Sequence, residues 1–486
     1  MPIFSLPSPY GIGTLGKEAL NFIDFLQAAG QKYWQMLPVG PTGYGDSPYQ
    51  SFSTFAGNPY FIDLEILVEE GSLLPEEITQ RSWGEHPWLV DYEKVYQNRF
   101  SLLRLAFQRD QAAHAREIGD FARENASWVQ DYALYMALKQ HFHMACFTDW
   151  QDEALKKGEG EALKVCRSLL AEETEFYIYL QYQFFKQWER VKSYARTQGI
   201  GIIGDIPIYV SMDSADVWSA PEYFLLDENR RPIEVAGVPP DYFSDAGQLW
   251  GNPLYNWEAM KKDGYSWWIR RIAGAARLYD VLRIDHFRGM ESYWSVPYGE
   301  TTAQKGRWIQ GPGMDLIQVL QEHFPKVAFI AEDLGYLTPQ VRRLVEASGF
   351  PGMKILEFAF DRRDAANSVY LPHSYTKNTV CYTGTHDNAT LAGWILDADP
   401  EDVAAAMAYF NVQEADKLPA AMLRGGMASV SDLFVAQMQD YLELGEEARI
   451  NVPGQAFGNW RWRMKAGVLT GDLARKIRKL TELYGR

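Results

Sequence analysis

Three short apolar segments in the second half of the chain each run into a carboxylic acid. They are residues 281–284, followed by Asp285, residues 327–331, followed by Glu332, and residues 379–385, followed by His386 and Asp387. Each segment resembles a buried strand, and a buried carboxylate is costly unless it is paired, so each acid should lie at the open end of its strand. Because a parallel barrel builds its active site at the C-terminal ends of its strands, the repetition predicts one site with three acids. The alternative is three unrelated acids that cap the helices after these strands.

Strand-like and helix-like segments alternate through much of the rest of the chain. Helical patterns occupy residues 266–279, 314–324 and 339–348, and Thr338-Pro339 and Gly349 are typical start and stop signals for the third. Further strand candidates are residues 33–38, 202–210, 353–358 and 449–452. This alternation predicts an α/β fold, a (β/α)8 TIM barrel in one catalytic domain over residues 1–486. No pattern of a C-terminal β domain follows the last strand candidate.

Two long segments interrupt the alternation. From about residue 91 to about residue 195 the apolar pattern is helical, and we interpret residues 65–170 as a mainly helical insertion in the barrel. Residues 237–252 form a long segment rich in proline, glycine and aromatic residues. Irregular loops of this length are usually functional or disordered, and the aromatic residues favour a lid over the site.

Composition excludes several classes of protein. The net charge is −16 and no basic run is present, which argues against nucleic acid or an anionic membrane as a partner. The three cysteines lack metal-ligand spacing and are expected to be reduced thiols. We see no signal peptide and no segment that could span a bilayer, so a cytoplasmic protein is expected.

The three acids fit the chemistry of retaining glycoside cleavage, which needs a nucleophilic carboxylate and a proton-donating carboxyl on one sugar ring. Arg283 next to Asp285 should keep that carboxylate ionised. Glu332 has no cation beside it in the sequence, so a raised pKa and an acid role are expected. His386 and Asp387 offer a donor and an acceptor for sugar hydroxyls. A metal site at His286 and His386 is the competing interpretation, but the spacings match no zinc pattern.

The sequence resembles the amylomaltase-type 4-α-glucanotransferases, or disproportionating enzymes, which are relatives of the α-amylases. The resemblance covers essentially the whole chain. It rests on SLPSPYGIG at 5–13, GDIPIYV at 204–210, the segment 239–250, RIDHFRG at 283–289, AEDLG at 331–335, GTHDN at 384–388 and NWRWR at 459–463. It implies that Asp285 is the nucleophile, Glu332 the general acid/base and Asp387 the transition-state stabiliser.

The resemblance also implies a set of substrate-binding residues and partners. Tyr49, Asp205, Arg283 and His386 would line the subsite of the cleaved sugar, and residues 237–252 would be the lid of the family. The full set of candidates is Ser47, Tyr49, Asp205, Tyr242, Phe243, Gln248, Trp250, Arg283, His286 and His386. The expected substrates are α-1,4-glucans and maltooligosaccharides with glucose as an acceptor, and no metal or other cofactor is expected. The alternatives are an α-amylase-type hydrolase and, less favoured, a non-catalytic glucan-binding protein.

Overall fold

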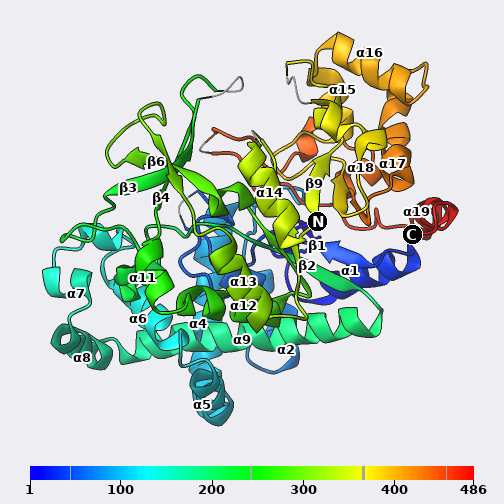
Figure 1. Cartoon of the computed structure of the whole chain (residues 1–486). Coiled ribbons are helices and arrows are strands. Elements are labelled where there is room, and N and C mark those ends of the chain that lie inside the picture. Colours follow the sequence, from blue (N-terminus) through cyan, green and yellow to red (C-terminus); the bar gives the residue numbers. More distant parts are fainter. Residues whose placement is uncertain (44, 241–243, 336, 364–366, 456) are drawn as a thin grey trace.

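A curved sheet of seven parallel strands forms the centre of the protein. The computed structural model describes residues 1–43, 45–240, 244–335, 337–363, 367–455 and 457–486. The strand order is β1-β2-β5-β8-β9-β10-β11. The strands are β1 (Tyr33–Gln35), β2 (Gly201–Ile206), β5 (Val281–Ile284), β8 (Ala328–Ala331), β9 (Gly352–Ile355), β10 (Thr379–Tyr382) and β11 (Leu433–Val435). α-Helices lie between consecutive strands of this sheet (Figure 1), except between β9 and β10, where the described helices are short 3-10 turns. This arrangement confirms the predicted α/β barrel class.

The strand predicted at residues 449–452 is wrong. In the described part of the chain this segment joins no sheet: the Asn451 amide donates to the His386 carbonyl, and the Trp460 amide donates to the Ile450 carbonyl. The edge strands of the sheet are β1 and β11, and one pocket is lined by residues of both, Gln35 and Val435. Four residues of alternating polarity fit an irregular extended segment as well as a strand, so the pattern alone could not separate them.

A second, antiparallel sheet of four strands in the order β4-β3-β6-β7 stands beside the barrel (Figure 1). Its strands are β3 (Glu234–Val238), β4 (Gln248–Pro253), β6 (Ser292–Pro297) and β7 (Arg307–Gln310). The expectation of a loop without regular structure at 237–252 is therefore wrong at both ends, because these residues pair as a hairpin. The central strand β3 also pairs with β6, a contact between distant segments that local sequence does not reveal. Tyr242 and Phe243 lie outside the described residues.

Nineteen α-helices are described in these residue ranges. They are α1 (Lys17–Ala28), α2 (Leu64–Glu69), α3 (Pro75–Thr79), α4 (Tyr92–Ala113), α5 (Ala115–Glu124), α6 (Val129–His141), α7 (Glu153–Lys157), α8 (Gly160–Leu169), α9 (Ala171–Thr197), α10 (Ala215–Ser219), α11 (Trp257–Lys262), α12 (Ser266–Leu278), α13 (Met314–His323), α14 (Pro339–Ser348), α15 (Leu391–Asp397), α16 (Pro400–Tyr409), α17 (Leu418–Ala428), α18 (Met438–Tyr441) and α19 (Gly471–Leu483). Among them, no helix is long and apolar enough to cross a membrane.

The boundaries of α14 illustrate how local sequence sets a helix. The Thr338 hydroxyl accepts from the Val341 amide at 3.3 Å, which satisfies one of the free N–H groups of the first turn. Pro339 occupies the first helical position, and Gly349 ends the helix in the left-handed conformation with φ 70°. Both predicted signals for this helix are confirmed.

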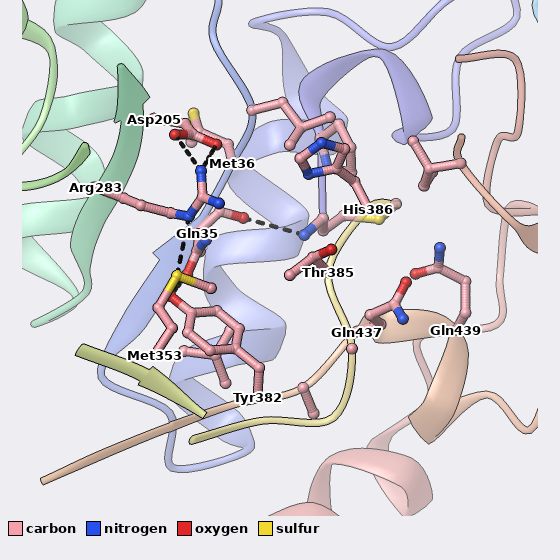
Figure 2. Close-up of a pocket in the computed structure, with 17 residues that line it drawn as sticks. Gln35, Met36, Asp205, Arg283, Met353, Tyr382, Thr385, His386, Gln437 and Gln439 are labelled. Atoms are coloured by element: carbon pink, nitrogen blue, oxygen red, sulfur yellow. Dashed lines mark hydrogen bonds and ion pairs between the residues drawn. The ribbon is translucent and has the colours of Figure 1, made fainter. Parts of the chain in front are cut away.

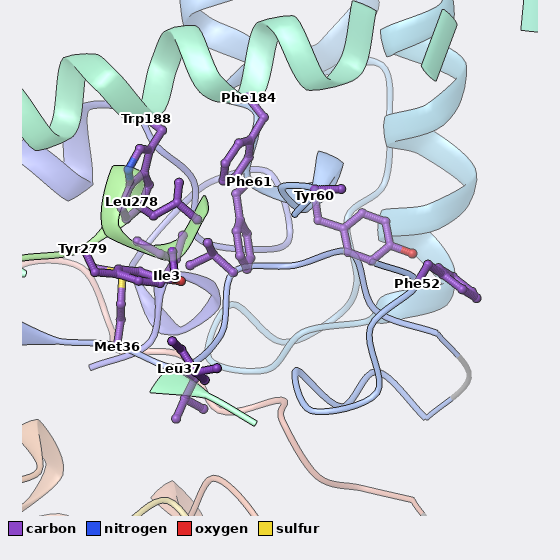
Figure 3. Close-up of a cluster of buried hydrophobic side chains, with 14 of the residues drawn as sticks. Ile3, Met36, Leu37, Phe52, Tyr60, Phe61, Phe184, Trp188, Leu278 and Tyr279 are labelled. Carbon is purple, nitrogen blue, oxygen red and sulfur yellow. The ribbon is translucent and has the colours of Figure 1, made fainter. Parts of the chain in front are cut away.

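Two groups of helices flank the barrel. Helices α2 to α9 lie between β1 and β2 in the sequence, and the long α9 packs against α4, α5, α6 and α8 (Figure 1). Phe184 and Trp188 of α9 reach the apolar core under the barrel, where Met36 and Tyr279 also lie (Figure 3). Helices α15 to α17 form a smaller core of their own around Leu391. The packing of these helices covers the outside of the barrel, and the C-terminal ends of the barrel strands remain free to form the site.

Candidate active site

The pairing of β2 with β5 sets Asp205 directly beside Arg283. The Arg283 guanidinium is almost completely buried, and its Nη1 donates to both carboxylate oxygens of Asp205 at 2.7 and 2.8 Å. The same Nη1 donates to Oδ1 of Asp285 at 2.8 Å. One buried cation therefore links the acids at the ends of two adjacent strands, which offsets part of the cost of burying them. Figure 2 shows Arg283 and Asp205 meeting in the pocket at the barrel mouth.

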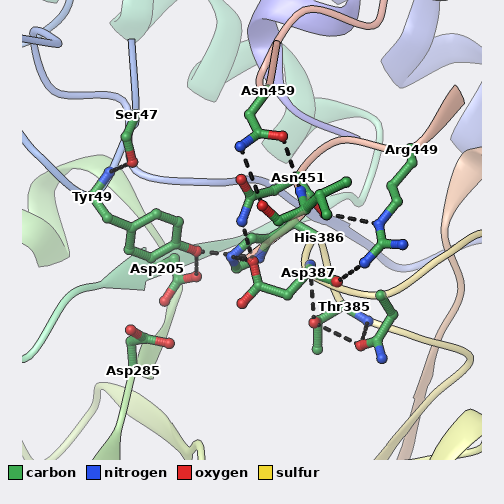
Figure 4. Close-up of polar contacts among 12 residues, drawn as sticks. Ser47, Tyr49, Asp205, Asp285, Thr385, His386, Asp387, Arg449, Asn451 and Asn459 are labelled. Atoms are coloured by element: carbon green, nitrogen blue, oxygen red, sulfur yellow. Dashed lines mark hydrogen bonds and ion pairs between the residues drawn. The ribbon is translucent and has the colours of Figure 1, made fainter. Parts of the chain in front are cut away.

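Tyr49 connects the Asp205–Arg283 pair to the opposite wall of the site, where His386 lies. Its hydroxyl donates to Oδ2 of Asp205 at 2.7 Å and lies 3.3 Å from Nδ1 of His386. The ring stacks on His386 with centroids 4.9 Å apart, so one of its faces packs on protein. Ser47 accepts from the Tyr49 amide at 3.3 Å, and the described contacts of Ser47 thus lie within its own loop (Figure 4).

Glu332 follows β8 and is held by backbone donors. Its Oε2 accepts from the His286 amide at 2.6 Å and its Oε1 from the Leu334 amide at 2.8 Å. Burial and, after it, the charge of Asp285 raise the pKa of Glu332 to about 7, although Arg283 and the two amides oppose this rise. The raised pKa expected from the sequence is confirmed, so this carboxyl keeps a proton up to near neutral pH.

Asp285 follows β5 and has the direct contact with Arg283 that the sequence predicts. Burial nevertheless raises the pKa of Asp285 above its usual value, with the Arg283 charge opposing and the Asp205 charge adding to the rise. The prediction that Arg283 keeps Asp285 ionised did not take this burial into account. The bond to the Arg283 guanidinium favours the ionised form of Asp285, whereas the hydrogen-bond donors to Glu332 are neutral backbone amides. The two acids thus differ in the way that nucleophile and general acid require.

Asp387 lies after β10 and is more exposed, with about half of its side chain accessible to solvent, 48%. Its Oδ1 accepts from Nδ2 of Asn451 at 2.6 Å and lies 3.3 Å from Nε2 of His386. Its backbone carbonyl accepts from Nη2 of Arg449 at 2.7 Å. Figure 4 shows Asn451 and Arg449 reaching Asp387 from the segment after the last barrel strand. Sequence reasoning assigned neither residue to the site, because nothing in the local pattern marks a contact over 64 residues.

We expect Asn451→Ala to lower kcat about tenfold, because the lost hydrogen bond to a carboxylate is worth about 1.4 kcal/mol in orienting Asp387. The measurement is the initial rate of glucose release from maltotriose, with the melting temperature as a check on folding. Asn21→Ala is the matched control, since Asn21 is exposed on α1 and bonds only to Glu18 among the described contacts. Equal rates for the two variants would contradict a positioning role for Asn451.

The hairpin of β3 and β4 reaches the site through Trp250. The Trp250 ring meets His286 edge-to-face at 4.8 Å, and its Nε1 donates to Oε1 of Gln248 at 3.1 Å. Burial lowers the pKa of His286 to about 3, so its imidazole is neutral at working pH. The structure thus brings Trp250 into contact with His286, which follows Asp285 in the sequence, and Gln248 into contact with Trp250. Tyr242 and Phe243 fall outside the described ranges.

No group of three histidine, cysteine or acidic side chains that could hold a metal ion is found in the part of the chain that the structure describes. The three cysteines are free thiols. Cys381 is buried in β10, and burial raises the pKa of its thiol to about 12. Cys381 therefore has the character of a packing residue.

A parallel α/β barrel with two carboxyl groups at adjacent strand ends, one bonded to a guanidinium and the other to backbone amides, is typical of one class of protein: barrel enzymes that cleave glycosidic bonds with retention. A family profile described as 4-alpha-glucanotransferase matches residues 1–470. A 4-alpha-glucanotransferase of Clostridium butyricum is 47% identical over 100% of both chains. Another from Thermus thermophilus is 47% identical over 99% of this chain and 97% of its own. The chain belongs to the 4-alpha-glucanotransferase family.

The solved structures agree with this assignment. An amylomaltase from Streptococcus agalactiae, solved in complex with acarbose, superposes with a TM-score of 0.97 at 42% identity and covers 100% of this chain and 98% of its own. An amylomaltase from Corynebacterium glutamicum has a TM-score of 0.78 at 19% identity, which shows a shared fold. The predicted family and transferase class are confirmed, and the hydrolase and the non-catalytic binding protein are not supported.

Proposed function

We propose that this enzyme moves α-1,4-glucan segments from a donor maltooligosaccharide or starch chain to an acceptor sugar. The observation that carries the proposal is the pair of acids at the ends of β5 and β8, one bonded to Arg283 and the other protonated near neutral pH. Asp285 is assigned as nucleophile, Glu332 as general acid/base and Asp387 as stabiliser of the transition state.

The reaction proceeds as a double displacement. Asp285 attacks the anomeric carbon while Glu332 gives its proton to the glycosidic oxygen, so the reducing-end sugar leaves and a glycosyl ester forms on Asp285. Glu332, now ionised, takes the proton of an acceptor hydroxyl, whose oxygen attacks the anomeric carbon and restores the Asp285 carboxylate. Asp387 holds sugar hydroxyls and stabilises positive charge at the anomeric carbon.

The remaining candidates would bind sugar around this centre. Asp205 and Arg283 stand deepest, and Tyr49 and His386 form the adjoining wall, which supports a subsite for the cleaved sugar. Trp250 and His286 supply an aromatic surface beside Asp285 for a neighbouring sugar ring. Gln248 contacts Trp250, whereas Ser47 acts through the loop that carries Tyr49.

Incubation with maltotriose tests the proposal. A transferase yields longer maltooligosaccharides together with free glucose, and glucose also serves as an acceptor. A hydrolase yields only shorter sugars, and a binding protein yields no new product. Chromatography of the products at several times separates the three outcomes, and absence of longer sugars would overturn the proposal.

The pKa values predict a bell-shaped dependence of kcat/KM on pH. Protonated Glu332 is required for the first step, so kcat/KM should fall as pH rises through about 7, approaching tenfold per pH unit. Ionised Asp285 is also required, so the acid limb should lie above the usual pKa of a free aspartate. Initial rates at low maltotriose concentration across the pH range measure both limbs. A flat profile through pH 7 would contradict the role of Glu332.

The hairpin is proposed to shield the glycosyl ester from water, since transfer competes with hydrolysis by the solvent. Trp250→Ala removes the ring that packs on His286 beside Asp285. We expect a higher ratio of hydrolysis to transfer, measured as reducing ends formed per glucose released from maltotriose. Trp308→Ala is the control, because Trp308 is an exposed tryptophan of the same antiparallel sheet on β7. An unchanged ratio in an active Trp250→Ala enzyme would contradict shielding by this side chain.

A cytoplasmic location is the last part of the proposal. Three free thiols support it, because the cytosol keeps cysteines reduced. Cell fractionation with an antibody to the chain tests it.

A further inference from the structure

Another acid lies past the end of a barrel strand, behind the loop that carries Asp387. Glu357 begins the short turn after β9, and its amide donates to the Thr383 carbonyl at the end of β10. The residue is only 4% exposed. It has no part in the double displacement described above, although a buried carboxyl is costly to keep without a function or a partner.

The Glu357 carboxyl packs against the backbone of Gly384. A Cβ atom at Gly384 would lie 2.7 Å from Oε1 of Glu357 and 3.0 Å from Cβ of Asn388, so only a glycine leaves room for this approach. Oε1 of Glu357 has no hydrogen-bond partner within the described part of the chain. The carboxyl does bond to the side chain of Asn388. This places a buried polar group directly behind the loop of residues 384–388.

Asn388 links Glu357 to the rest of the loop of residues 384–388, which carries Asp387. Its Oδ1 accepts from both the amide and the hydroxyl of Thr385, at 2.9 Å each. The Thr385 hydroxyl oxygen in turn accepts from the Asp387 amide at 3.3 Å. A bond from Asn388 Nδ2 to Glu357 leaves Oδ1 turned toward Thr385, because an amide presents its donor and its acceptor on opposite sides.

We infer that Glu357 is a positioning residue for Asp387, which it orients through Asn388 and Thr385. The inference rests on the proposed function, in which Asp387 stabilises the transition state. Since a misplacement of about 1 Å in a catalytic group can cost about 100-fold in rate, such a support should be visible in kcat.

The charges around Glu357 indicate whether its carboxyl orients Asn388 in the neutral or in the ionised form. Burial raises the pKa of Glu357 well above its usual value, and the nearby charges of Asp440 and Glu446 raise it further while Arg449 opposes them. The neutral carboxylic acid has one acceptor oxygen and one hydroxyl, a pattern that a glutamine amide reproduces. Glutamine should therefore replace Glu357 with little loss, whereas an apolar residue of similar size should not.

The test compares Glu357→Gln with Glu357→Leu. We expect Glu357→Gln to keep kcat for maltotriose within about threefold, and Glu357→Leu to lower it about 10- to 100-fold with little change in KM. Glu357→Leu should slow a glycosyl fluoride substrate by a similar factor, because Asp387 acts in both reactions whereas the acid Glu332 is needed only for the natural substrate. Ile477→Ala, a cavity variant on α19, controls for loss of stability alone.

A second pair of measurements tests whether Glu357 acts on Asp387 through Asn388. Asn388→Ala should lower kcat as Glu357→Leu does, and combining the two should cost no more than either alone. A crystal structure of Glu357→Leu should show Asn388 rotated and Asp387 displaced, a result that does not depend on activity. An unmoved loop, additive effects, or equal losses for Glu357→Gln and Glu357→Leu would overturn the inference. Failure of the wild-type enzyme to extend maltotriose would instead overturn the proposed function, with the structural comparison still deciding the role of Glu357.

Discussion

Asp285→Asn should lower transfer from maltotriose by about 10⁴-fold or more, because the amide cannot form the glycosyl ester. The fold should survive, since the amide oxygen of the substituted side chain could still accept from Nη1 of Arg283, where the Asp285 carboxylate does now at 2.8 Å. Arg283 also keeps both oxygens of Asp205, so no buried cation is left without a partner. The measurement is glucose release at saturating maltotriose, together with the melting temperature.

A matched control separates loss of the nucleophile from loss of a charge. Asp416→Asn removes an exposed carboxylate whose described partner is Lys417, far from the barrel strands in sequence. It should leave kcat unchanged. Turnover by a folded Asp285→Asn protein within about tenfold of the wild type would show that another group attacks the anomeric carbon.

Glu332→Gln should separate the natural substrate from an activated one. Without a proton donor, cleavage of maltotriose should slow by about 10²- to 10⁴-fold, the usual contribution of general acid catalysis. A glycosyl fluoride needs no protonation to leave, so it should still glycosylate Asp285 rapidly. The second step lacks its base and should be slow. A burst of fluoride equal to the enzyme concentration and a mass increase of one glycosyl group on the protein should therefore be observed.

Two additions make this experiment decisive. Azide attacks the glycosyl ester without base assistance, so it should restore turnover of the fluoride in Glu332→Gln but not in Asp285→Asn. The double variant Asp285→Asn with Glu332→Gln should show no burst. If the fluoride and maltotriose lose activity by the same large factor, Glu332 is not the general acid.

The sequence predicted the candidate catalytic acids better than it predicted the architecture around them. Asp285, Glu332 and Asp387 each follow an apolar segment that is itself the strand, so the pattern gave both the strand and the end where the acid lies. The sequence does not mark Glu357, because the apolar run at 353–358 predicts one strand, whereas β9 ends at Ile355. The extra residues form a turn, and that turn places the carboxyl behind Gly384.

By itself the sequence determined the alternation of strands and helices, the caps of α14 and the three strand-end acids, because each depends on periodicity and chemistry within a short window. Only the tertiary structure decided which of these residues meet. Tyr49 bonds to Asp205 across 156 residues, Asn451 bonds to Asp387 across 64, and β3 pairs with β6 instead of forming an open loop. The tertiary structure also decided the pKa values of Asp285 and Glu332, since these depend on burial and on a nearby guanidinium. Contacts of this kind exist only after distant segments have been brought together, and the entropy of closing those loops is overcome by the whole packed barrel rather than by any local pattern.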